Sequence, residues 1–259
     1  MPKNSEKIEM IKAKIIRAEK HLADISLINT KFKSVECSLS VEPDSKGDLS
    51  YLSFNLPATP KELPPIVGDC LNNLRSSLDY LIWQIVESNK ISAPSISNMF
   101  PICETKQQFK KQLQKKRLRG VPEAAISRIE KLQPFSGVDN RSLSFLNALC
   151  NKDKHRDLNY TISVASDIKV SFFKNDRNVF NTMIGNDELR NGEVFGNLGF
   201  NPSLFNSVDV KIIGAAQAFI AFKDLNSEFG EVIPVIDSLN SISEHIKHEV
   251  IDSLVQYIS

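Results

Sequence analysis

The chain has 259 residues, 41% of them hydrophobic and 24% charged, which is the composition of a globular protein with a substantial core. Its formal net charge of +1 creates no overall field that would favour or exclude nucleic acid. No stretch approaches the ~18 consecutive apolar residues of a membrane span, and the N-terminus lacks the apolar segment of a secretion signal. We therefore expect a cytoplasmic protein with no membrane partner.

The first segment predicts a long amphipathic helix from about Ser5 to Asn29. Its apolar residues recur at alternating spacings of three and four: Ile8, Ile11, Ile15, Ala18, Leu22 and Ile25. This narrow seam is suited to packing against another helix. Either the C-terminal helix or the same helix of a second subunit would cover it, and the second alternative predicts a homodimer through the N-terminal helix.

Two β-like runs follow, at 34–41 and 50–56, and the turn-forming residues between them predict a hairpin. Prolines then lead into a second long helix, from about Pro65 to Ser88. After a proline-bearing loop, further helices are expected at Thr105–Lys116, Pro122–Leu132 and Asn140–His155.

Beyond Asp157 the pattern changes to alternating apolar runs that predict an antiparallel sheet of four or five strands. The runs are Tyr160–Ala165, Ile168–Phe173, Glu193–Phe200 and Val208–Phe222. An amphipathic helix, Pro234 to Tyr257, closes the chain. This order predicts an α+β fold, an N-terminal helical bundle with a small β-hairpin, followed by an antiparallel sheet and a C-terminal helix. We expect a mainly helical region at 1–158, with the hairpin (34–56) inserted in it, and a second region at 159–259 packed with the first as one unit.

The helix expected at 65–88 has two contrasting faces on a helical wheel. One is a continuous apolar stripe: Leu71, Leu74, Leu78, Leu81, Ile82 and Ile85. The opposite face carries small amides, the chain's only tryptophan (Trp83), Tyr80 and Asp79, with Arg75 at its edge. Arg75 and Asp79 are four residues apart and able to pair. Such a face indicates either a half-buried functional surface or side chains that only hydrogen-bond neighbouring helices.

The helix expected at 140–155 ends in a concentrated polar run, Asn151-Lys152-Asp153-Lys154-His155-Arg156. His155 has the side chain whose ordinary pKa allows proton transfer in both directions near neutral pH. Arg156 is suited to binding a phosphate with two hydrogen bonds. The alternative is a polar helix end whose cations complement the helix dipole.

Positive charge is concentrated between Glu104 and Gln133, where nine lysines and arginines face three glutamates, a local charge of +6. This asymmetry indicates a polyanionic partner. The candidate nucleic-acid-binding residues are Lys115, Lys116, Arg117 and Arg119. The alternative is an ordinary solvated helix face.

The four cysteines, Cys37, Cys70, Cys103 and Cys150, lie far apart and have no metal-ligand spacing, so we expect free thiols. The signatures of P-loop and dinucleotide-binding proteins, of α/β-hydrolases and of zinc proteases are missing. We expect no metal and no cofactor.

Four motifs in order resemble a broad set of uncharacterised bacterial proteins that share a "GDxLxNLRSALDHLxW … FPI … LQPY … NxDKHR" pattern. In this chain they read GDCLNNLRSSLDYLIW (68–83), FPI (100–102), LQPF (132–135) and NKDKHR (151–156). The resemblance covers about Pro65 to Leu158 and implies no established activity.

A more distant resemblance is to the HEPN superfamily of helical ribonucleases and nucleotide-binding modules, whose signature is an arginine followed a few residues later by a histidine. Here Tyr80 stands at the histidine's position, so His155 takes the proton-transfer role in this hypothesis. The resemblance implies binding of RNA or another phosphate-rich ligand and, if the protein is an enzyme, metal-independent cleavage of ribonuclease type.

In that hypothesis Arg75 and Arg156 hold the phosphate, while His155 is the general acid or base oriented by Asp79 or Asn151. Lys115, Lys116, Arg117 and Arg119 contact the phosphate backbone of the RNA in this hypothesis. The alternative is a non-catalytic dimeric interaction or structural protein whose polar motifs form a buried network.

Overall fold

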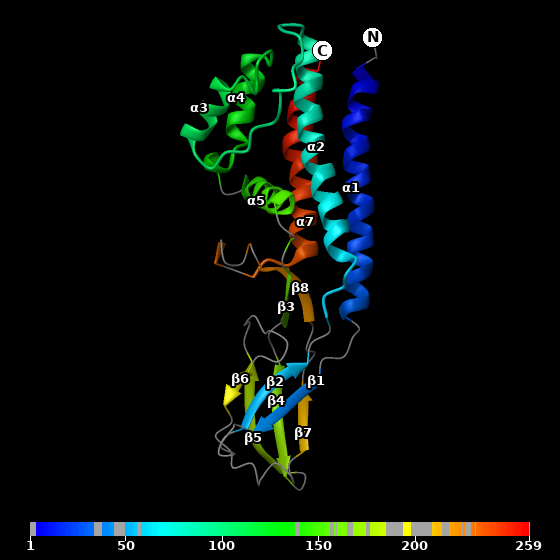
Figure 1. Ribbon diagram of the computed structural model, residues 1–259, viewed down its shortest axis with the longest axis vertical. Helices are drawn as coiled ribbons and strands as arrows, with labels where there is room; N and C mark the ends of the chain where they lie inside the picture. Colours follow the sequence, from blue (N-terminus) through cyan, green and yellow to red (C-terminus); the bar gives the residue numbers. More distant parts are fainter. Residues whose placement is uncertain are drawn as a thin grey trace. The chain divides into compact units, whose positions relative to one another are not determined.

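The structure, a computed structural model, describes residues 4–33, 38–43, 50–55, 58–137, 140–155, 158, 160–164, 168–174, 177–184, 194–197, 209–213, 218–223, 225, 229–230 and 232–258. Side chains are described for 6–32, 58–137, 140–153, 158, 160, 219–223, 225, 229–230 and 232–258. The chain divides into two units (Figure 1). Unit 1 comprises Met1–Ser26, Glu62–Leu158 and Val235–Ser259, and unit 2 comprises Leu27–Lys61 and Asn159–Pro234.

Unit 1 is built from helices. They are α1 (Asn4–Lys33, whose last turns belong to unit 2), α2 (Leu63–Asn89), α3 (Lys106–Gln114), α4 (Glu123–Lys131), the short 3-10 helix η1 (Pro134–Ser136) and α5 (Arg141–His155). Figure 1 shows α1 and α2 side by side, and they are antiparallel. Lys7 donates to Ser88 Oγ at 2.9 Å near one end, and the Cys70 thiol lies 3.7 Å from the Ala18 carbonyl near the other.

The core of unit 1 is centred on α2. The apolar stripe predicted for this helix is confirmed, since each of its members is at most 1% exposed: Leu71, Leu74, Leu78, Leu81, Ile82 and Ile85. Burial of each such side chain stabilises the fold by about 1.5–3 kcal/mol. The α1 seam is also buried within the chain from Ile11 to Ile25.

The C-terminal segment, expected as one helix, is interrupted by a π-helix. It consists of α7 (Val235–Glu244), the π-helix η4 (His245–Ile251), α8 (Asp252–Leu254) and the 3-10 helix η5 (Val255–Tyr257). Three of its fully buried residues, Ile246, Val250 and Leu254, follow one another at intervals of four. In an α-helix of 3.6 residues per turn, residues at this spacing move gradually from one face of the helix to the next. The wider π turn returns them to the core face.

Unit 2 contains the strands, which the backbone arranges in three small antiparallel sheets. β1 (Ser38–Pro43) pairs with β2 (Ser50–Asn55), which pairs with β6 (Val194–Asn197). β3 (Tyr160–Val164) pairs with β8 (Ala218–Phe222). The third sheet has the order β5 (Arg177–Ile184), β4 (Ile168–Lys174) and β7 (Asp209–Ile213).

The α+β fold class predicted from the sequence is wrong. Where side chains are described, the protein is predominantly helical with one lone strand, and no sheet is complete there. The backbone strands, moreover, are divided among small sheets in place of the single antiparallel sheet. Alternating patterns mark a strand but do not specify its partner, and here partners such as β2 and β6 are far apart in sequence. The hairpin (34–56) belongs to unit 2, and the C-terminal helix belongs to unit 1.

Candidate functional site

Arg75 and Asp79 lie on α2 and bind the backbone of Phe100, in an arrangement we call the Phe100 clamp. Arg75 donates to Asp79 Oδ1 at 3.1 Å and also to the Phe100 carbonyl. Asp79 Oδ1 accepts the Phe100 N–H at 2.9 Å. The arginine and aspartate side chains are 18% and 34% exposed, while the Phe100 ring is fully buried. The clamp therefore fixes the loop 90–105 against α2, because both backbone groups of Phe100 find charged partners.

A buried glutamine fixes the far end of the same loop. Gln133, which is completely buried, accepts the Cys103 N–H at 2.9 Å and donates to the Ile129 carbonyl at 3.0 Å. Asn140 in turn donates to the Gln133 carbonyl at 3.0 Å. Two separate sets of hydrogen bonds thus anchor the loop 90–105: the Phe100 clamp at the FPI motif, and Gln133 of the LQPF motif at Cys103, the residue that follows FPI.

The two polar motif helices contact each other. Asp153 of α5 lies so close to Gly68 of α2 that a Cβ added at Gly68 would be 2.9 Å from Asp153 Oδ1. The Cys150 thiol of α5 lies 3.8 Å from the Leu71 carbonyl. An alanine at Gly68, in the second turn of α2, would therefore require the exposed Asp153 carboxylate to move.

Of the four predicted catalytic residues, the structure describes the side chains of two, Arg75 and Asp79, which lie together on α2. His155 is the last residue of α5, but its side chain and all of Arg156 lie outside the described residues. Arg75 and Asp79, as described, serve the Phe100 clamp.

The predicted nucleic-acid-binding residues lie at the end of α3 and in the turn that follows. Lys115, Lys116 and Arg119 are exposed, whereas Arg117 is half-buried and donates to the Ser97 carbonyl at 3.3 Å. Asn98 donates to the carbonyls of Arg117 and Arg119, at 3.2 and 3.0 Å. The turn is therefore held to the loop 90–105, and it presents its exposed cations from a fixed backbone.

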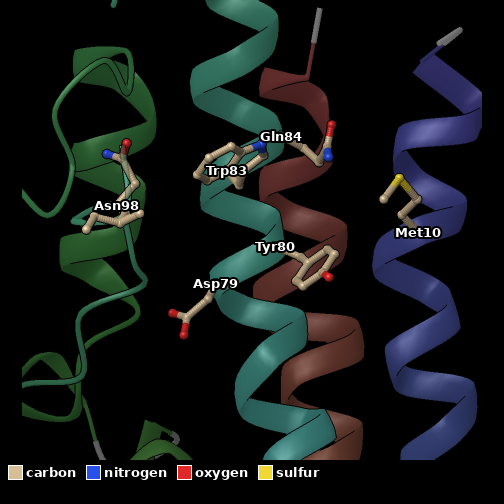
Figure 2. Close-up of a pocket in the computed structure, with 7 residues that line it drawn as sticks. Met10, Asp79, Tyr80, Trp83, Gln84 and Asn98 are labelled. Atoms are coloured by element: carbon tan, nitrogen blue, oxygen red, sulfur yellow. The ribbon is translucent and has the colours of Figure 1, made fainter. Parts of the chain in front are cut away.

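A groove of about 520 Å³ crosses α2 between α1 and the loop 90–105 (Figure 2). It is lined by Met10, Asp79, Tyr80, Trp83, Gln84, Ile96 and Asn98. Tyr80 and Trp83 are 39% and 38% exposed, and Lys14 Nζ lies 5.4 Å from the centre of the Tyr80 ring. The Phe100 clamp shares Asp79 with the groove, so the network that fixes the loop also fixes one wall of the groove.

Three cysteines are free, as predicted, and all three are buried: Cys70, Cys103 and Cys150. Burial raises the pKa of the Cys70 thiol to about 12, and the neighbouring Cys150 adds to the shift. Burial also raises the pKa of Cys103 to about 11; Glu104 acts in the same direction and Arg75 opposes it. Thiols with such pKa values stay protonated and unreactive at neutral pH.

No protein-family model, curated protein sequence or solved protein structure matches this chain. Among the residues that the structure describes, no helix is long and apolar enough to cross a membrane. Within that same part of the chain, no group of three or more His, Cys, Asp and Glu residues is placed to hold a metal ion.

The sequence prediction missed several residues of the groove. Trp83 and Tyr80 stood out on the polar face of α2, but Met10, Ile96 and Gln84 did not. Met10 lies off the α1 seam, and Ile96 is an isolated apolar residue in a loop of serines and prolines; it is 97% exposed. Met10 and Ile96 could have been recognised as groove residues because each is an apolar residue that lies outside a predicted core face.

Proposed function

We propose that unit 1 is a non-catalytic binding module for RNA or another phosphate-rich polymer. The binding surface is a set of exposed cations on α3 and the following turn, which we call the cationic cluster: Lys106, Lys110, Lys111, Lys115, Lys116 and Arg119. The observation that carries the proposal is that no side chain of the cationic cluster has a carboxylate partner among the described residues. Uncompensated cations on a fixed backbone attract a phosphate chain and release its counterions on binding.

The engagement of Arg75 and Asp79 with Phe100 supports a non-catalytic role. Arg75 is held against the loop 90–105, because its Nη2 donates both to a carboxylate and to a carbonyl. Asp79, which the catalytic hypothesis uses to orient His155, takes part in the clamp instead, because its Oδ1 accepts two hydrogen bonds there. Phe109, the aromatic residue within α3, is buried, so the cationic cluster offers charge without base stacking. Binding is therefore expected to depend on salt and little on sequence.

The test measures binding of a labelled single-stranded RNA at several salt concentrations. The variant is K115Q/K116Q/R119Q, and the matched control is K12Q/R17Q/K20Q, which removes three exposed cations from α1. We expect the first variant to bind at least about tenfold more weakly and its salt slope to fall by roughly 0.7 for each phosphate that the protein no longer neutralises. Equal weakening by both variants, or no binding by the wild type, would overturn the proposal.

A cleavage assay in EDTA separates this function from that of a nuclease. We expect intact RNA after incubation with the wild type. Cleavage that His155→Ala abolishes, with thermal stability unchanged, would restore the ribonuclease hypothesis.

The second candidate function is that of a non-catalytic interaction protein. The Phe100 clamp favours it, because polar motifs that satisfy one another stabilise a scaffold without needing a ligand. Two results together would favour this candidate. Neither the wild type nor the variants would bind RNA, and sedimentation would show the protein bound to a second copy of itself or to another protein.

A further inference from the structure

The groove across α2 concentrates side chains that folded proteins usually bury. Eight large hydrophobic side chains are exposed among the described residues, and four of them line the groove: Met10, Tyr80, Trp83 and Ile96. Its volume of about 520 Å³ lies within the range of small-molecule pockets, about 300–1,000 Å³. Concentrated aromatic exposure in a concave site of this size indicates ligand binding.

Gln84 carries a buried polar atom of the groove that has no hydrogen-bond partner among the described residues. Its side chain is 5% exposed, and Oε1 has no hydrogen-bond partner within the described part of the chain. The carboxylate and the second amide of the groove have partners, Asp79 in the Phe100 clamp and Asn98 in the turn after α3. In Figure 2, Gln84 extends from α2 toward the side of α1, where Met10 extends from α1 toward α2.

The Gln84 amide favours a ligand whose hydrogen-bonding groups match its own C=O and NH₂ groups. The last torsion of a glutamine side chain is broad, so its amide turns readily toward the groove. It then offers one carbonyl acceptor and an NH₂ donor side by side. A purely hydrocarbon ligand would leave Oε1 unpartnered, whereas a ligand with an N–H beside a C=O would pair with both groups.

We infer that the groove binds a small planar aromatic molecule that carries an N–H donor next to a C=O acceptor, as an aromatic lactam does. Its ring packs against Tyr80 and Trp83. Its lactam edge forms two hydrogen bonds with the Gln84 amide, donating its N–H to the amide oxygen and accepting from the NH₂ group. The clamped loop keeps the Ile96 and Asn98 wall in place before the ligand arrives.

The test uses the fluorescence of Trp83, the single tryptophan of the chain, as a reporter inside the groove. The probe is isoindolin-1-one, and the control ligand is 2-methylisoindolin-1-one, in which a methyl group replaces the donor hydrogen. We expect a saturable change with the first compound and roughly tenfold weaker binding of the second, because one hydrogen bond is removed. Gln84→Leu should weaken the first compound by about the same factor and make the two compounds equal. Gln107→Leu, at an exposed glutamine, should change neither.

Two results would overturn the inference: unchanged Trp83 fluorescence with both compounds, or equal binding of both compounds to the wild type. The second comparison needs no variant, so it holds even if Gln84→Leu fails to fold. Neither compound carries a phosphate or a net charge, and the groove residues are not part of the cationic cluster. Failure here is thus distinguishable from failure of RNA binding.

Discussion

Gly68 of α2 and Asp153 of α5 lie so close together that a side chain at the glycine would require the aspartate carboxylate to move. An added Cβ would be 2.9 Å from Asp153 Oδ1 and 3.3 Å from Oδ2. This contact joins the first and last of the four sequence motifs, although Gly68 and Asp153 are more than eighty positions apart in the sequence. The glycine of one motif and the aspartate of the other thus both lie where α5 packs against α2.

The first prediction concerns Gly68→Ala. Alanine is normally favoured over glycine within a helix by about 0.5–1 kcal/mol, because it restricts the unfolded chain. At Gly68 we expect that gain to be reduced or cancelled, since the new methyl group displaces the exposed Asp153 carboxylate. Urea unfolding at neutral pH measures the difference.

The double variant Gly68→Ala with Asp153→Ala is the control for this close approach. In the Asp153→Ala background, Gly68→Ala should become stabilising, with a coupling free energy of about 0.5–1.5 kcal/mol. If the effects of the two substitutions on the free energy of unfolding are additive, the close approach of Asp153 does not affect the stability change caused by Gly68→Ala.

The second prediction concerns the Phe100 clamp. Arg75→Lys keeps the charge but replaces a planar, multiple donor with a flexible ammonium group, which does not reproduce the hydrogen bonds to Asp79 and the Phe100 carbonyl. We expect a loss of about 1–2 kcal/mol in the free energy of unfolding, in a partly exposed site. Arg119→Lys, at an exposed arginine of the cationic cluster, should change it by less than about 0.5 kcal/mol. If the two variants change the free energy of unfolding equally, the Phe100 clamp does not contribute to the stability of the fold.

Helical patterns predicted unit 1 well, because a single period of 3.6 residues governs each helix. The buried stripe of α2 and the half-exposed face with Tyr80 and Trp83 both follow from that period. The partner of Arg75 was predictable only in part. Its pairing with Asp79 is a local spacing of four, whereas its bond to the Phe100 carbonyl spans twenty-five residues of chain and has no local signal.

Long-range pairing also explains why the sheet prediction failed. Several strand positions were recognisable, but β2 pairs with β6 and β3 with β8 across long stretches of chain. The groove could not be predicted for the same reason, since Met10, Trp83 and Ile96 come from three separate segments that only the fold brings together.

The third prediction concerns Gln133, which joins the loop 90–105 to the end of α4. Gln133→Leu has a similar volume but leaves the Cys103 N–H without its present partner, whereas the Ile129 carbonyl still accepts the Leu132 N–H at 3.2 Å. We expect a loss of about 1–3 kcal/mol, because one buried polar group is left unpaired. Hydrogen exchange should also show faster exchange of the Cys103 amide. Gln107→Leu, at an exposed position, serves as the control, and unchanged protection of Cys103 would refute the assignment.

The fourth prediction concerns stability at alkaline pH. An ordinary thiol has a pKa of 9.0, whereas burial raises the pKa of Cys70 to about 12 and that of Cys103 to about 11. Above pH 9 the unfolded chain releases these two protons while the folded protein keeps them, so the free energy of unfolding falls as pH rises. Each thiol contributes a loss of about 1.4 kcal/mol per pH unit until its folded pKa is reached.

Urea unfolding between pH 9 and 10 isolates this thiol effect. Lys247, whose pKa is raised by its hydrogen bond to Glu19, adds to the loss of stability only at higher pH, above its ordinary value of 10.5. Cys70→Ala with Cys103→Ala lowers stability at every pH through poorer packing, but it should remove the steep decline above pH 9. The free energy of unfolding of the double variant and of the wild type could instead fall with the same slope as pH rises. In that case groups other than Cys70 and Cys103 release the protons, and the two buried thiols do not cause the loss of stability at alkaline pH.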